Sequence, residues 1–144
     1  LLNESYLSQM PPKSTGRELF NPPWLEQQLT EFKDLAAEDV QRTLCEYTAL
    51  TIAHEVETYR LGDQPALYVC GGGTRNPLLM KRLSELLPSW DVDSTTSKGV
   101  DADYMEAMAF AWLAQRHVHQ LPSNLPEVTG ASRAASLGVL YHAD

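Results

Sequence analysis

The segment LYVCGGGTRNP at residues 67–77 limits most strongly what this chain can fold into. Its apolar residues 67–70 predict a buried strand, and the three glycines that follow require a turn. Asn76 is a good N-cap residue, and Pro77 suits the first position of a helix. Leucines then recur at helical spacing until Pro88 ends the helix. The segment therefore predicts a strand, a glycine turn and a capped helix, an order typical of α/β proteins.

The three glycines of this turn, Gly71, Gly72 and Gly73, have two interpretations. Without side chains they let a ligand approach the main chain, and the N–H groups at the following helix start favour an anion or a sugar hydroxyl. In this interpretation the turn is part of a nucleotide-binding site. The other interpretation is an ordinary tight turn between a strand and a helix. This segment alone does not decide between them.

Hydrophobic periodicity predicts the other elements of the chain. We expect helices near residues 21–32, at 37–59, from Asp101 or Asp103 to about 117–120, and at 132–141, with a strand at 91–96. In the helix at 37–59, glutamates such as Glu46 are expected to lie mostly in solvent. Two strands cannot form an independent sheet of normal size. Either further strands in this chain with weak sequence signals or strands from a preceding part of a longer protein are expected to complete it.

Bulk composition argues against several classes of partner. The 144 residues carry a formal net charge of -8 and no cluster of Lys or Arg, which opposes binding to nucleic acid. No apolar run approaches the roughly 20 residues that cross a bilayer, and no secretory signal opens the chain, so we expect no membrane association. Cys45 and Cys70 lack metal-ligand or redox spacing, which predicts reduced thiols in a cytoplasmic protein.

Glu106 is the strongest candidate for a catalytic residue outside the glycine turn. It lies in the first two turns of the predicted helix DADYMEAMAFAW, among apolar and small neighbours. A carboxylate there is stabilised by the positive helix end, and it could hold a water or a sugar hydroxyl or share general-base work. The alternative is an ordinary exposed helix glutamate. Asp101 and Asp103 are expected to cap the helix.

Other polar residues give weaker signals. The loop KSTGR at residues 13–17 could meet a phosphate or a sugar, or it could be a turn held by its own hydroxyls. His117 and His119 are two residues apart and do not share a helix face, so no metal site is predicted. The sequence contains neither GxSxG nor GxxxxGK[ST], which argues against a serine-hydrolase elbow and a Walker-type phosphate loop.

Four motifs resemble those of the anhydro-N-acetylmuramic acid kinase family and follow one another in the family's order. This family belongs to the actin, sugar kinase and heat-shock chaperone ATPase superfamily. The four motifs are PKSTGRELF at 12–20, YVCGGGTRNPLLMKRL at 68–83, DYMEAMAFAWLA at 103–114 and LPSNLPEVTGAS at 121–132. Together they cover nearly the whole chain. The glycine turn by itself would indicate only the superfamily.

The resemblance implies ATP-dependent conversion of anhydro-N-acetylmuramic acid to N-acetylmuramic acid 6-phosphate in peptidoglycan recycling, usually with Mg²⁺. Gly71, Gly72, Gly73 and Asn76 match the adenosine-contacting turn of the family. Glu106 matches its helix glutamate at the sugar site, where it would orient the attacking water. The implied fold is α/β: the carboxy-terminal lobe of an actin-like (ribonuclease H-like) sugar kinase, with helices packed around a partial mixed sheet over residues 1–144.

The chain departs from the family pattern in one respect. The amino-terminal phosphate-binding segment and the Asp-Thr-Gly-Pro-Gly segment that supplies the catalytic aspartate are absent from these residues. We therefore expect the carboxy-terminal lobe alone, without kinase activity of its own. A competing hypothesis is an actin-like or chaperone-like ATPase module that acts on a protein partner. The helices at 37–59 and 103–115 could also pack against a second copy to form a homodimer.

Overall fold

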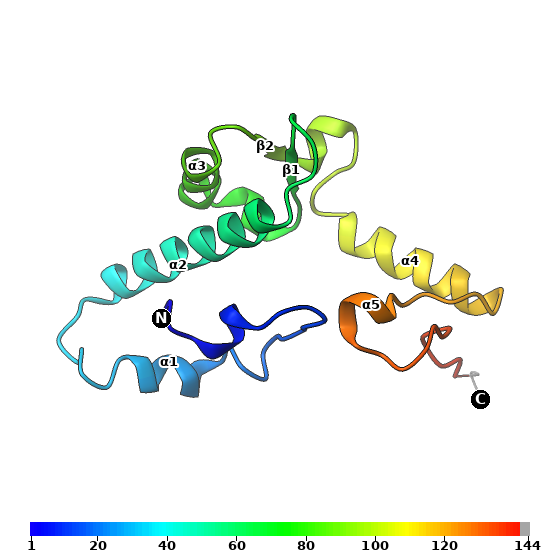
Figure 1. The fold of residues 1–144 in the computed structure, drawn as a ribbon, viewed down its shortest axis with the longest axis horizontal. Helices are drawn as coiled ribbons and strands as arrows, with labels where there is room; N and C mark the ends of the chain where they lie inside the picture. The colour runs from blue at the N-terminus through cyan, green and yellow to red at the C-terminus, as the bar shows by residue number, and fades with distance from the viewer. Residues whose placement is uncertain (142–144) are drawn as a thin grey trace. The chain divides into compact units, whose positions relative to one another are not determined.

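The computed structural model describes residues 1–141, and they belong to two compact units. The first unit comprises Leu1–Asn3 and Gln28–Met105, and the second comprises Glu4–Gln27 together with the described residues from Glu106 onward. Figure 1 shows the order of the elements along the chain. In the described residues, no helix combines the length and apolar character that crossing a membrane requires.

Each unit holds a separate set of elements. The first contains α2 (Ala37–Thr58), β1 (Ala66–Val69), the 3-10 helix η2 (Gly72–Arg75), α3 (Pro77–Leu86), β2 (Asp91–Ser94) and the 3-10 helix η3 (Thr95–Lys98). The second contains the 3-10 helix η1 (Ser5–Ser8), nearly all of α1 (Pro22–Gln28) and of α4 (Met105–Val118), and α5 (Pro126–Thr129).

The sheet of the first unit is a parallel pair. β1 pairs with β2 in a register that runs from Ala66 opposite Asp91 to Val69 opposite Ser94. A parallel pair needs a crossover connection, and α3 supplies it. The described residues thus form an α/β fold, as predicted. Their sheet is parallel, whereas a partial mixed sheet was expected, because the described residues contain no strand that pairs antiparallel with these two.

Small and branched side chains build the core of the first unit. Ala49 of α2 and Leu83 of α3 are fully buried, and they pack together with Leu79. The inward side chains of the strands, such as Leu67 and Val92, pack against this cluster. Residues of α2 and α3 thus pack together against one face of the strands.

The outer face of the same strands is polar and open. The Tyr68 hydroxyl donates a hydrogen bond to Asp91 over 3.2 Å, and the Lys98 ammonium lies 5.0 Å from the centre of the Tyr68 ring. The predicted burial of residues 67–70 was therefore wrong for Tyr68 and Cys70, which are exposed. Within the described residues, helices cover only the face that carries Leu67 and Val69.

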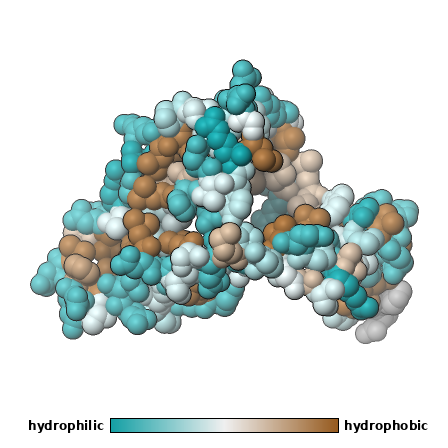
Figure 2. All heavy atoms as spheres, viewed as in Figure 1, coloured by the Kyte–Doolittle hydropathy of each residue, from teal (hydrophilic) through white to brown (hydrophobic). Residues whose placement is uncertain are grey.

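The second unit has little interior. Phe20 packs edge-on between Tyr6 and Trp24, with ring centres 6.3 and 5.2 Å apart, and the Trp24 indole donates to Glu4 over 2.9 Å. That hydrogen bond lowers the pKa of the Glu4 carboxyl. No residue of α4 is buried, and Phe110 is 63% exposed. Apolar patches consequently alternate with polar ones on the molecular surface (Figure 2).

The predicted helix at 132–141 was wrong. Ala135 uses its backbone groups for bonds distant in sequence: its N–H donates to the Asn124 side chain over 2.7 Å, and its carbonyl accepts from Ser123 over 2.9 Å. The Leu137 N–H donates to the Ser123 hydroxyl over 3.1 Å. These bonds replace the local pattern that a helix requires. The small residues of this segment had suggested a helix, but α5 instead occupies Pro126–Thr129.

Candidate functional site

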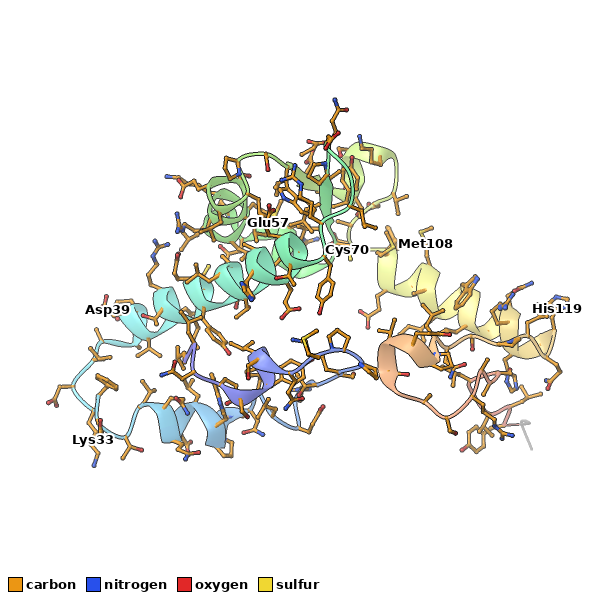
Figure 3. The ribbon with its side chains drawn as sticks, viewed as in Figure 1. Lys33, Asp39, Glu57, Cys70, Met108 and His119 are labelled. Carbon is orange, nitrogen blue, oxygen red and sulfur yellow. The ribbon has the colours of Figure 1, made fainter. Side chains whose placement is uncertain are left out.

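The glycine turn lies at the carboxyl edge of the parallel strands. It begins at Cys70, immediately after β1 (Figure 3), and η3 follows β2 at the same edge. In α/β sheets, ligands bind preferentially outside the carboxyl ends of parallel strands. The structure thus places the predicted turn where such a fold offers a ligand site.

The three glycines of the turn have different surroundings. Gly71 has φ of 73° and ψ of -168°, a region of backbone conformation that is essentially restricted to glycine. A Cβ atom at Gly71 or Gly72 would meet nothing within 4 Å, so the main chain here is open to an approaching group. A Cβ at Gly73 would lie 3.6 Å from the Leu79 side chain, which fills that side of the turn.

Asn76 caps α3, as the sequence predicts. Its side-chain oxygen accepts from the N–H groups of Leu78 and Leu79 over 3.1 and 3.2 Å, and its amide donates to the Cys45 sulfur over 3.7 Å. Two of the helix N–H groups expected to attract an anion are therefore already bonded. A further role of Asn76 in ligand binding stays a prediction.

Two interactions join the turn to the segment that precedes α4. The Gly71 N–H donates to the Ala102 carbonyl over 2.8 Å, and the Arg75 guanidinium forms an ion pair with Asp103. The sequence predicted Asp103 only as a capping residue and missed this contact. The available signal was a pair of opposite charges, one in the turn and one just before the next helix, but their separation of 28 residues gave no reason to join them.

Glu106 lies in the first turn of α4, where the helix dipole stabilises a negative charge. Its side chain is exposed, so the apolar surroundings expected from the sequence do not cover it within the described residues. Glu106 belongs to the second unit and the glycine turn to the first. The catalytic role of Glu106 stays a prediction.

The weaker candidates have local partners. The Lys13 ammonium donates to the Leu7 carbonyl over 3.4 Å and lies 5.2 Å from the centre of the Tyr6 ring, so residues outside the loop at 13–17 hold this side chain. His117 Nδ1 lies 3.5 Å from the Ser136 hydroxyl. Among residues 1–141, no group of three or more His, Cys, Asp or Glu side chains has the arrangement of a metal site.

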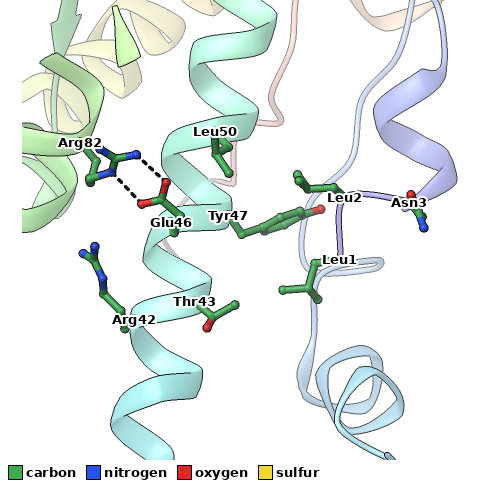
Figure 4. Close-up of a pocket in the computed structure, with 9 residues that line it drawn as sticks. All are labelled: Leu1, Leu2, Asn3, Arg42, Thr43, Glu46, Tyr47, Leu50 and Arg82. Atoms are coloured by element: carbon green, nitrogen blue, oxygen red, sulfur yellow. Dashed lines mark hydrogen bonds and ion pairs between the residues drawn. The ribbon is translucent and has the colours of Figure 1, made fainter. Parts of the chain in front are cut away.

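A pocket of about 690 Å³ lies elsewhere in the first unit (Figure 4). Leu1–Asn3, residues of α2 and Arg82 of α3 line it, but no residue of the glycine turn does. Arg82 binds both oxygens of Glu46, over 2.8 and 2.7 Å, and also pairs with Glu85. These bonds lower the pKa of Glu46, which was expected in solvent. The charge of Arg82 is thus already matched within the chain.

The comparisons with known proteins agree on one family. The family profile described as anhydro-N-acetylmuramic acid kinase matches residues 1–143. The chain is 72% identical over 141 residues to the anhydro-N-acetylmuramic acid kinase of Vibrio parahaemolyticus, covering 98% of the chain and 38% of that relative. It is 65% identical over 144 residues to the protein of the same name from Vibrio cholerae, covering 100% of the chain and 39% of that relative.

A more distant relative shows the same pattern. The anhydro-N-acetylmuramic acid kinase of Mannheimia succiniciproducens is 54% identical over 147 residues, covering 98% of the chain and 39% of that relative. The chain spans about two-fifths of the length of the curated relatives it matches. By the extent of the family match and the identity to these relatives, the chain belongs to the anhydro-N-acetylmuramic acid kinase family.

Proposed function

We propose that this chain forms the adenosine-binding part and one wall of the sugar site of an ATP-dependent anhydro-N-acetylmuramic acid kinase. The family membership supports the reaction, and the open main chain at Gly71 and Gly72 supports the nucleotide site. The latter is the structural observation that carries the proposal. A phosphate donor bound at a strand's carboxyl edge suits an enzyme that works mainly by positioning its reactants.

In the proposed reaction, water attacks the anomeric carbon of the sugar and the carbon–oxygen bond of the anhydro bridge breaks. The freed oxygen takes the γ-phosphoryl group of ATP, which leaves ADP. Glu106 would orient the attacking water and share in accepting its proton. Gly71, Gly72 and Gly73 would bring the main chain against the adenosine, with Asn76 holding the helix start in place.

We propose that Mg²⁺ binds together with ATP, as is usual for kinases. The described residues contain no cluster of ligands that would hold this ion by themselves. Mg²⁺ commonly takes most of its ligands from substrate phosphates and water. The acidic residues described in this chain are therefore given no role in binding it.

The superfamily fold, the cellular location and the pathway of the enzyme are also proposals. We propose that residues 1–144 form the carboxy-terminal lobe of an actin-like (ribonuclease H-like) sugar kinase, that the enzyme is cytoplasmic and that it acts in peptidoglycan recycling. The parallel pair crossed over by α3 is compatible with such a lobe. Association into a homodimer is a further proposal, for which light scattering on the full-length protein is the measurement.

The test uses a full-length chimera, in which this chain replaces the matching 141 residues of the Vibrio parahaemolyticus relative. With ATP, Mg²⁺ and anhydro-N-acetylmuramic acid, we expect the chimera to form the sugar 6-phosphate. The 144-residue chain alone should form none. A chimera that folds but leaves the sugar unchanged would contradict the proposal. A thermal shift with peptide but not with sugar would instead favour a chaperone-like module, which the names of the relatives do not support.

A further inference from the structure

The ion pair between Arg75 and Asp103 connects the glycine turn to a distant segment. Arg75 is the last residue of η2, within the turn, and Asp103 lies two residues before α4 begins. Their side chains are 73% and 45% exposed. An exposed pair contributes little to the stability of a fold. Its position, rather than its strength, indicates a role.

A main-chain bond holds the other end of the same turn. The Gly71 N–H donates to the Ala102 carbonyl over 2.8 Å. Ala102 is only 6% exposed, and its own N–H donates to the Thr96 hydroxyl over 3.1 Å. Gly71 and Arg75, at the two ends of the turn, are therefore held by the consecutive residues Ala102 and Asp103. The buried main chain of Ala102 fixes the first end. At the second end, the Asn76 cap holds the main chain, and the ion pair holds the Arg75 side chain.

We infer that Asp103 is a positioning residue for nucleotide binding, which acts by holding Arg75 and with it the second end of the glycine turn. The inference rests on the proposed function, because it assumes that the turn contacts ATP. A turn ordered before the ligand arrives avoids the entropic cost of ordering it on binding. The Asp103 carboxylate forms the ion pair with Arg75. The backbone N–H of Asp103 donates to the Asp101 carboxylate over 2.9 Å and completes the local turn.

Asp103→Asn in the full-length chimera tests this role. We expect the Kd of a non-hydrolysable ATP analogue, measured by calorimetry, to rise about two- to fivefold, the effect of losing an exposed ion pair. The KM for ATP should rise equally, while kcat and the KM for the sugar stay within about twofold, since chemistry is not the affected step. Asp103→Glu keeps the charge and should retain most of the affinity.

Asp63→Asn is the matched control, because it removes one negative charge from an exposed turn away from the site. Equal Kd values for Asp103→Asn and Asp63→Asn would overturn the inference. A fall in kcat with an unchanged Kd would overturn it too. Melting temperatures of both variants show whether a change in folding accounts for any loss.

Arg75→Gln completes a double-mutant cycle. If Asp103 acts through Arg75, Asp103→Asn has no further effect on the Kd in the Arg75→Gln background. An undiminished effect there would overturn the inference, even if Arg75 itself contacts the nucleotide. The proposed function is tested by a different result. A parent chimera that binds the analogue but phosphorylates no sugar contradicts the sugar-kinase proposal. The double-mutant cycle can still be measured on that chimera and still tests Asp103. A parent that does not bind the analogue contradicts both.

Discussion

The two units differ in how far they bury their apolar side chains. In the first, α2, α3 and the strands enclose Leu83 completely. In the second, α4 carries apolar residues such as Met108 and Phe110, yet more than half of each remains exposed within the described residues. An apolar residue stabilises a fold in proportion to the area it removes from water. The first unit thus supplies its own core, whereas the apolar residues of α4 bury little of their surface within the described residues.

The largest expected effect tests this difference directly. Leu83→Ala should lower the free energy of unfolding of the chain by about 2–5 kcal/mol, because it empties a fully enclosed site. Met108→Ala on α4 should lower it by less than about 1 kcal/mol, because half of that side chain is already in water. Urea unfolding of both variants measures the two values. Equal losses would remove the distinction between the units.

Gly71→Ala and Gly72→Ala test the role of backbone conformation in the glycine turn of the first unit. Both sites have room for a methyl group, but only Gly71 has a positive φ. We expect Gly71→Ala to cost about 1–3 kcal/mol through backbone strain, and Gly72→Ala to cost less than about 1 kcal/mol. Thermal unfolding of the two variants gives the difference. If the two substitutions cost the same, the positive φ of Gly71 does not limit which residue the turn accepts.

Glu106→Gln separates function from stability in the second unit. The substitution keeps the size of the side chain and removes its charge. We expect kcat for the sugar in the full-length chimera to fall at least about tenfold, with little change in melting temperature because the side chain is exposed. Glu127→Gln, on the exposed surface of α5, serves as the control. An unchanged kcat would make Glu106 an ordinary surface residue.

The smallest expected effect concerns pH and the link between α2 and α3. The hydrogen bonds from Arg82 lower the pKa of Glu46 below its ordinary value of 4.5. Glu46 therefore stabilises the fold above the unfolded-state pKa, and this contribution disappears as the pH falls through the lowered value. Glu46→Gln should flatten the loss of stability below about pH 4.5, measured by urea unfolding across pH. Glu31→Gln, whose side chain is exposed, should leave the slope as it is.

Local signals in the sequence predicted most of the first unit. The helix at 37–59 appears as Ala37–Thr58, and Asn76 caps α3 as expected. The strand at 91–96 ends early, at Ser94, because the Ser94 hydroxyl accepts from the Thr96 N–H and starts η3. These features depend on residues within one or two turns of each other, so a single sequence contains the information.

Contacts between distant residues were not predictable in the same way. Glu46 was expected in solvent, but Arg82 binds it from 36 positions away. The bond from Gly71 to Ala102 and the pair of Arg75 with Asp103 depend on the register of β1 against β2. No periodicity in the sequence reports that register. The position of the glycine turn between β1 and α3 was predictable, while the interactions that hold the turn against the rest of the unit were not.

Leu79 gives the core and the turn a shared boundary. Its side chain belongs to the buried cluster, and the same side chain occupies the space beside Gly73. A larger or smaller residue at this position would change both the packing of α3 and the shape of the glycine turn. If the turn binds a nucleotide as proposed, a substitution at Leu79 that changes thermal stability would change nucleotide affinity as well.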